Sequence, residues 1–226
     1  HSNNVAVGKN ALTAITTGYN NIAIGEKVAS ALTTGFRNVL IDPDYESGGA
    51  TAGVTTGSYN VGLGYSTLVA LTDGASNIAI GTQAGAVVAG GSNNILMGYQ
   101  AGLQVNSGQN NIIMGWRAGD ALTTMNNIVA IGYNAGTAIN SADANQSVLI
   151  GYSTGAALTD GQGNTAVGAY ALDAESQGDY NTAIGYQSLS AQTGVDGTVG
   201  NTAVGYQSGN ALTTGTRNVA VGILAL

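Results

Sequence analysis

A short pattern of polar, apolar and glycine positions recurs along the whole chain. It runs asparagine, β-branched residue, small residue, large aliphatic residue and glycine, as in Asn21-Ile22-Ala23-Ile24-Gly25. The pattern occurs thirteen times, most copies lie 17 residues apart, and Asp42 takes the place of one glycine. Alternating apolar residues predict short strands, and a fixed short period predicts a solenoid with one coil per repeat. We therefore expect one all-β, parallel β-solenoid array over residues 1–226.

The strand positions of the repeat form three columns. The β-branched column and the large aliphatic column are two residues apart, so they share a face of the strand. We expect that face to line the interior of the coil. The column between them is mostly alanine and should point outward. A small apolar residue there favours a second buried face, approached closely by a neighbouring chain.

The polar and glycine columns have structural roles. Asparagines stacked in register can chain their amides from coil to coil. A turn glycine three residues before the asparagine, such as Gly35, is expected to supply a positive φ angle. The repeat residues that best represent the asparagine and anchor-glycine columns are Asn21, Gly25, Asn77, Gly81, Asn94, Gly98, Asn111, Gly115, Asn181 and Gly185.

Composition narrows the class of protein. Only 8% of residues are charged, the net charge is −7 and there is no cysteine. The five basic residues are scattered, so no basic patch for nucleic acid is present. The sequence contains no run of 18 consecutive apolar residues, so it predicts no membrane-spanning segment. Low charge predicts that much surface is buried against other copies of the chain, and the abrupt ends of the repeat suggest a fragment of a longer fibre protein.

The repeat motif resembles that of a known group of surface proteins. Two clear instances are Gly18-Tyr19-Asn20-Asn21-Ile22-Ala23-Ile24-Gly25 and Gly178-Asp179-Tyr180-Asn181-Thr182-Ala183-Ile184-Gly185-Tyr186-Gln187-Ser188. They resemble the head repeats of trimeric autotransporter adhesins and the repeats of phage tail fibres. The resemblance covers the whole chain. It implies a left-handed β-roll, a homotrimer of chains side by side, and an extracellular role in host or surface attachment, on a virion or a bacterial surface.

No catalytic or metal-binding motif is visible, and we expect neither enzymatic activity nor a cofactor. The only histidine is His1, and cysteine is absent. Serine and threonine hydroxyls therefore lack a histidine base that could activate them. Acidic residues such as Asp73 and Asp160 lie mostly in turns, where solvated aspartate is the simpler interpretation.

Receptor contacts, if the segment makes any, should lie where the repeat breaks. The most irregular stretch runs from Asp42 to Ala50 and includes Asp44, Tyr45 and Glu46. Such a loop could contact a receptor or a cation, since binding residues concentrate on loops of rigid scaffolds. It could equally be a tolerated surface insertion. The turn after Gly136 and the stretch Ala191 to Gly200 are further breaks.

Aromatic residues often follow the anchor glycine, as at Tyr99, Trp116 and Tyr133. An exposed stripe could stack on the sugar rings of a cell-surface glycan. A stripe buried between chains would be a packing ladder with its hydroxyls at the edge. The regular spacing favours packing.

Four functions remain open from the sequence. The first is a non-enzymatic attachment segment of a trimeric fibre, with a glycan or protein receptor. The second is a self-assembling structural filament or spacer with no ligand. An ice-binding solenoid is weaker, because threonine is irregular in the turns. A polysaccharide depolymerase would need acidic residues gathered on one face.

Overall fold

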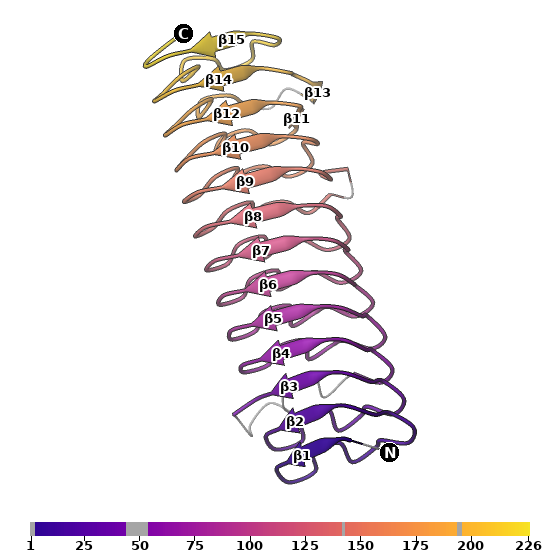
Figure 1. The fold of residues 1–226 in the computed structure, drawn as a ribbon. Coiled ribbons are helices and arrows are strands. Elements are labelled where there is room, and N and C mark those ends of the chain that lie inside the picture. The colour runs from indigo at the N-terminus through magenta and orange to yellow at the C-terminus, as the bar shows by residue number, and fades with distance from the viewer. Residues whose placement is uncertain (1–2, 44–53, 142, 194–195) are drawn as a thin grey trace. The chain divides into compact units, whose positions relative to one another are not determined.

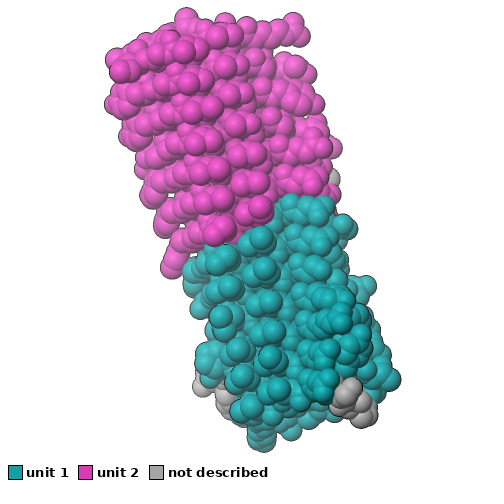
Figure 2. Space-filling model, viewed as in Figure 1, with its two compact units in different colours: residues 1–111 teal, residues 112–226 magenta. Residues whose placement is uncertain are grey.

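The computed structural model describes residues 3–43, 54–141, 143–193 and 196–226. It is an all-β, parallel β-solenoid of about 12 turns. The chain divides into two compact units, residues 1–111 and 112–226 (Figure 2). Both units are built from the same coil, which holds one short strand and a series of tight turns (Figure 1). The expectation of a single thirteen-repeat array stays a prediction.

Every three-residue strand lies on the predicted columns. In unit 1 the order is β1 to β6, and in unit 2 it is β7, β8, β9, β10, β12, β14 and β15. Neighbouring strands within each unit pair in parallel and in register, for example Ile22 with Val39 and Thr182 with Thr202. A second small sheet in unit 2 pairs β11 with β13. The strands are β1 Val5–Val7, β2 Ile22–Ile24, β3 Val39–Ile41, β4 Val61–Leu63, β5 Ile78–Ile80, β6 Ile95–Met97, β7 Ile112–Met114, β8 Val129–Ile131, β9 Val148–Ile150, β10 Thr165–Val167, β11 Gly178–Asp179, β12 Thr182–Ile184, β13 Gly197–Thr198, β14 Thr202–Val204 and β15 Val219–Val221.

The prediction of which strand face lines the core was wrong. The middle residue of each three-residue strand from β2 to β15 is buried, whether it is glycine, alanine, leucine or isoleucine. The two flanking columns are half-buried or exposed instead, with Ile24 36%, Leu63 43% and Ile184 40% exposed. The alanine column is therefore the core column. The β-branched and large aliphatic columns face outward.

The cause of this reversal is the opposite wall of the coil. The residue six positions after the middle strand residue packs against the middle column from the other side. A Cβ added to Gly102 would lie 2.7 Å from a terminal methyl carbon of Leu96, and a Cβ added to Gly155 would lie 2.9 Å from one of Leu149. The coil is thus too thin for two large residues at one level, because protein interiors are close-packed.

Large and small residues compensate one another across this thin core. Leu96 is followed six residues later by Gly102, and Leu149 is followed by Gly155. Where the strand carries alanine, the opposite wall often carries leucine. Ala166 with Leu172 and Ala183 with Leu189 are examples, and all four residues are buried. At other levels both residues are small, as with Ala79 and Gly85, and there a leucine of a neighbouring coil, Leu96, approaches the glycine.

The asparagine ladder is present as predicted. In unit 1 each ladder asparagine from Asn21 to Asn111 donates its Nδ2 to the Oδ1 of the preceding one, over 3.0–3.2 Å. The same Nδ2 also donates to the carbonyl of a turn glycine, as from Asn94 to Gly108 at 2.8 Å. All six of these side chains, from Asn21 to Asn111, are fully buried. The ladder therefore joins successive coils through satisfied polar groups inside the core.

The ladder changes in unit 2, where Ile128 and Ser147 occupy the column. Ser147 Oγ accepts a hydrogen bond from the backbone N–H of Asn164 at 3.2 Å. It thereby takes the place of the asparagine Oδ1 that accepts this N–H in other coils. The asparagines resume at Asn164, and Asn181, Asn201 and Asn218 continue the backbone contacts to the preceding Oδ1.

The turn glycines serve a different purpose from the one predicted. The glycines three residues before the asparagine position lie outside the positive-φ region, so their conformation does not require glycine. They are Gly18, Gly35, Gly57, Gly74, Gly91, Gly108, Gly161, Gly178 and Gly215. Glycine is required there because space is short: a Cβ on Gly35 would lie 2.2 Å from the carbonyl oxygen of Gly57 in the next coil. Positive φ occurs at the anchor glycines instead, with Gly25 at 127° and Gly185 at 136°.

A matched pair of substitutions in β6 tests the assignment of faces. Leu96→Ala should lower the free energy of unfolding by about 2–5 kcal/mol, because it leaves a cavity in the thin core. Ile95→Thr on the outward face should cost about 1 kcal/mol or less in the unassembled chain, since Thr165, Thr182 and Thr202 already occupy that column. Urea unfolding of both variants measures the difference. If Ile95→Thr lowers the free energy of unfolding as much as Leu96→Ala or more, the flanking columns line the core, as the sequence first predicted.

Candidate functional site

The described residues offer no enclosed site. They form no pocket, and no group of three or more histidine, cysteine, aspartate or glutamate side chains among them could hold a metal ion. Within the same residues, no helix has the length and apolar character needed to cross a membrane. Candidate recognition features are therefore surface features of the coils.

The outward strand face is the largest of these features. It consists of the two flanking columns of the three-residue strands, and we call it the aliphatic face. Its members are valine, isoleucine, leucine, methionine and threonine, without a charged residue at any level of either unit. Nine side chains on it are at least 36% exposed: Val5, Val7, Ile24, Leu63, Ile78, Ile112, Ile184, Val219 and Val221. Contiguous exposed apolar surface of this kind marks interaction sites in soluble proteins.

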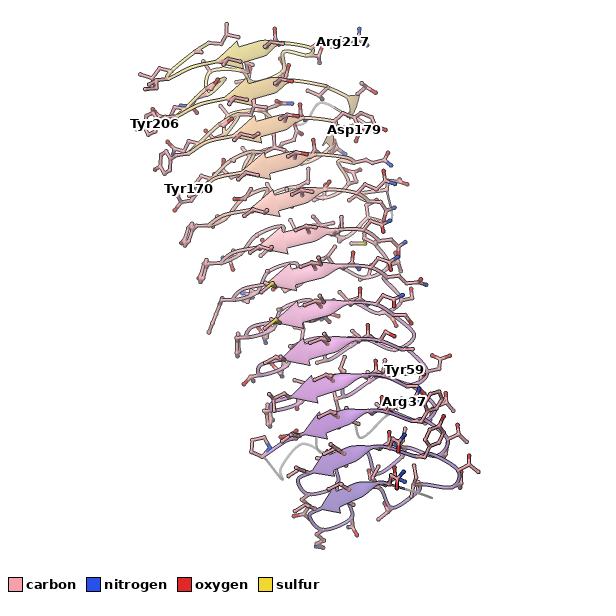
Figure 3. The ribbon with its side chains drawn as sticks, in the orientation of Figure 1. Arg37, Tyr59, Tyr170, Asp179, Tyr206 and Arg217 are labelled. Atoms are coloured by element: carbon pink, nitrogen blue, oxygen red, sulfur yellow. The ribbon has the colours of Figure 1, made fainter. Side chains whose placement is uncertain are left out.

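A tyrosine ladder borders this face in unit 2, beyond the ends of the strands. Tyr133 and Tyr152 stack with ring centroids 5.0 Å apart and planes 5° apart. Tyr186 and Tyr206 stack at 5.5 Å and 11°, and Tyr170 joins the two pairs through edge contacts. Figure 3 shows Tyr170 and Tyr206 at the edge of the ribbon opposite Asp179 and Arg217. Desolvation, together with the neighbouring Tyr152, raises the pKa of Tyr170 above its ordinary value.

This geometry bears on the two interpretations of the aromatic stripe. Tyr133, Tyr152, Tyr186 and Tyr206 are 42–48% exposed, so they are not buried within the single chain. Within the stacked pairs, however, each ring covers a face of its neighbour. Sugar rings stack on aromatic faces, and the stacking within each pair takes up one face of each ring. The ladder therefore favours packing between coils.

The predicted receptor contacts fall into different environments. Tyr99 is 36% exposed, Trp116 48% and Tyr133 44%. Asp42 is fully buried, and its Oδ2 accepts the backbone N–H of Ser66 at 3.2 Å. Asp44, Tyr45 and Glu46 lie outside the described residues. Contact between any of these residues and a receptor stays a prediction.

A polar cluster interrupts the apolar core of unit 2, beside the break at Ala191 to Gly200. Glu175 and Gln192 occupy the core position that Leu158 fills one coil earlier, and both are fully buried. Glu175 Oε1 accepts the backbone N–H groups of Ser176, Gln177 and Gly178 at 2.8–3.0 Å. Gln192 Oε1 accepts Asn201 Nδ2 at 3.0 Å. These contacts hold a turn in shape, as expected for a buried carboxylate that accepts several backbone donors.

One cluster was missed by the sequence analysis. Tyr19, Phe36, Arg37 and Tyr59 gather on unit 1 just before the starts of the strands, and we call them the arginine–aromatic cluster. Figure 3 shows Arg37 and Tyr59 close together at this edge. Aligning the repeats on the asparagine would have found the cluster, because Tyr19 and Phe36 share a column and Arg37 and Tyr59 share the next one.

The chain was compared with protein families, characterised sequences and solved structures. No family model, no characterised protein sequence and no solved structure matches this chain. The molecule is thus defined by its own features as a β-solenoid with repeats of about 17 residues and asparagine ladders.

Proposed function

We propose that this chain is a non-enzymatic segment of an extracellular attachment fibre in which three copies pack through their aliphatic faces. The observation that carries the proposal is the aliphatic face itself. The resemblance of the repeat to trimeric adhesin heads and phage tail fibres supports the number of copies, the left-handed β-roll and a location on a virion or a bacterial surface.

A second copy of the chain is the partner that fits the aliphatic face best. The face has no charge, so its partner must be equally apolar. Its rows repeat at the spacing of adjacent strands, about 4.8 Å, and another copy presents rows at the same spacing. Side chains of one copy can then pack between the rows of the next, level after level. Low overall charge, 8% of residues, agrees with burial of this face in an assembly.

The energy available is sufficient for a permanent assembly. Burying roughly 40 Å² of exposed apolar surface per side chain contributes about 1 kcal/mol at each position. The two columns recur at every level, so the contribution is summed along the coils. Obligate interfaces are apolar in this way, resembling a protein core cut in half.

A purely structural filament or spacer is the second candidate function. The aliphatic face supports it equally, since assembly does not require a receptor. The two candidates differ in whether the exterior of the assembly binds a ligand. The arginine–aromatic cluster on unit 1 favours attachment.

Charged residues on the aliphatic face should dissociate the assembly. Ile24→Lys combined with Leu63→Lys places two ammonium groups where the proposal puts an apolar interface. We expect sedimentation velocity to show monomers, because an unpaired buried charge costs several kcal/mol. Thr17→Lys combined with Thr34→Lys adds the same charge to exposed turns and should leave the assembly intact. Circular dichroism checks that both variants keep their strands. If the protein with Ile24→Lys and Leu63→Lys assembles like the control, the proposed interface is contradicted.

A further inference from the structure

The arginine–aromatic cluster is an ordered group of rings on the surface of unit 1. Tyr19 and Phe36 stack with centroids 5.0 Å apart and planes 3° apart. Phe36 and Tyr59 meet edge to face, with centroids 5.1 Å apart and an angle of 74°. Tyr19 and Tyr59 remain 38% and 46% exposed. Each lies at one end of the three-ring group, so aromatic surface is open on both sides of Phe36.

Arg37 is held against these rings in one position. Its Cζ lies 5.9 Å from the Phe36 ring centroid and 5.5 Å from that of Tyr59, within cation–π range. Its Nη1 donates to the Tyr59 hydroxyl at 2.8 Å. Its backbone has φ 57° immediately before the ladder residue Asn38, which anchors the base of the side chain. These contacts reduce the rotamer freedom that the guanidinium would lose on binding a ligand.

The guanidinium keeps donor groups for an outside ligand. A guanidinium has five N–H donors, and the Tyr59 hydroxyl takes one of them. In the part of the chain that the structure describes, Arg37 forms no ion pair; the two ion pairs there join Lys9 to Glu26 and Arg117 to Asp120. Arg37 is also exposed. A carboxylate from solution can therefore approach it.

The negative charge of the chain is divided unequally between the two units. Residues 1–111 carry a net charge of −2, from three basic residues (Lys9, Lys27 and Arg37) and five acidic ones (Glu26, Asp42, Asp44, Glu46 and Asp73). In unit 2 the acidic side chains predominate. An anionic ligand is therefore repelled less at unit 1 than the net charge of −7 suggests.

We propose that the arginine–aromatic cluster binds a carboxylated sugar. The carboxylate accepts hydrogen bonds from Arg37, whose planar fork matches carboxylate geometry. The apolar face of the sugar ring lies on Tyr59 or Tyr19, since tyrosine offers an apolar body with a polar tip. The arginine distinguishes this cluster from the tyrosine ladder of unit 2, which also exposes stacked rings but, among the described residues, has no arginine held against Tyr133, Tyr152, Tyr186 or Tyr206 by a cation–π contact. This inference rests on the proposed attachment function and specifies its ligand.

Binding at one cluster is expected to be weak, and assembly increases it. A trimer carries three identical clusters, so a surface dense in acidic sugars engages several at once. Linked binding events raise the overall affinity well above that of a single site without any new contact. Screening by salt should weaken each event, because the carboxylate contact is exposed.

The chain contains a matched control for Arg37. Arg217 occupies the same repeat position, directly before the ladder residue Asn218, with φ 58° against 57° for Arg37. Both side chains are exposed. Arg217 follows Thr216 and has no aromatic ring in cation–π contact among the described residues. Figure 3 labels the two arginines, which lie on different units.

Saturation-transfer NMR with 3′-sialyllactose tests the proposal, with lactose as the neutral probe. The wild-type protein should transfer saturation to the sialic acid protons at low salt, and lactose should give little signal. Arg37→Gln should weaken binding by on the order of tenfold, because it removes a charge-assisted contact. Tyr59→Phe, which deletes only the hydroxyl that orients Arg37, should weaken it severalfold. Arg217→Gln should bind like the wild type.

Three results would overturn the proposal: no sialyllactose signal from the wild type, equal signals from lactose, or equal losses for Arg37→Gln and Arg217→Gln. Unchanged thermal unfolding of both arginine variants shows that any loss is local. The outcome is separable from the proposed function. If the protein is a trimer that does not bind sialyllactose, only the ligand assignment is contradicted. If it is a monomer that binds sialyllactose, the ligand assignment stands and the trimer is contradicted.

Discussion

Asn94→Ala is expected to destabilise unit 1 by about 3–5 kcal/mol, more than any conservative surface change. The Asn94 side chain is fully buried between Asn77 and Asn111. Its Nδ2 donates to Asn77 Oδ1 at 3.0 Å and to the Gly108 carbonyl at 2.8 Å. Its Oδ1 accepts the backbone N–H of Asn111 at 3.1 Å and the Nδ2 of Asn111 at 3.0 Å. Alanine leaves these buried partners unsatisfied, and each unsatisfied group costs about 1–3 kcal/mol.

Asn106→Ala is the control for that substitution. Asn106 is an exposed asparagine in the neighbouring turn, and its side chain is outside the ladder. We expect a change within about 0.5 kcal/mol. Amide hydrogen exchange at Asn111 and Ile95 is the better measurement, because coils of a solenoid can open separately. The Asn111 N–H donates to Asn94 Oδ1, and the Ile95 N–H donates to the Asn111 carbonyl. If the Asn94→Ala protein protects these amides as well as the wild type, the ladder does not join the coils as described.

Gly132→Ala is expected to have the second large effect. Gly132 has φ 137°, and an added Cβ would lie 2.1 Å from the carbonyl oxygen of Gly151 in the next coil. Alanine therefore imposes both a disfavoured backbone conformation and a collision with rigid backbone. We expect a loss of at least about 3 kcal/mol, measured by thermal or urea unfolding.

Gly222→Ala separates those two costs. Gly222 has φ 123°, similar to Gly132, but no atom lies within 4 Å of an added Cβ. Its substitution should cost only the conformational part, about 1–2 kcal/mol. The difference between the two variants then reports how closely successive coils approach. Equal losses for both would mean that the close approach of Gly151 carries no energetic weight.

The sequence predicted the strands and the ladder well, because both follow directly from the repeat. Asparagine at a fixed offset before each strand stacks in register once the strands pair in parallel. An alternation of period two, however, shows only that two columns share a face. It does not say which face is inside, and β-branched residues were assigned to the core by their hydrophobicity alone.

The signal that decides the face was present six residues downstream. Leu96 with Gly102 and Ala183 with Leu189 vary in opposite directions, as expected for residues that share one level of a thin core. Reading single columns misses such a relation, since neither column is uniformly large or small. The turn glycines were misread for a similar reason. The space available at Gly35 depends on Gly57 in the next coil, which local turn chemistry does not describe.

The arginine–aromatic cluster escaped notice because it occurs once. The recurrent aromatic residues after the anchor glycine drew the attention instead, with packing favoured over sugar stacking, and the structure shows Tyr133 stacked on Tyr152 and Tyr186 on Tyr206. Phe36 and Arg37 are adjacent in the chain, but Tyr59 is separated from them by the longest insertion. Only pairing of β3 with β4 brings Tyr59 beside Phe36 and Arg37.

The central claim is that the aliphatic face of each unit is covered by other copies of the chain. Sedimentation equilibrium of the wild-type protein tests this most directly, since it gives the mass in solution independently of shape. We expect a species of about three times the chain mass of 22.3 kDa that persists on dilution. A stable, soluble monomer of 22.3 kDa across the concentration range would contradict it.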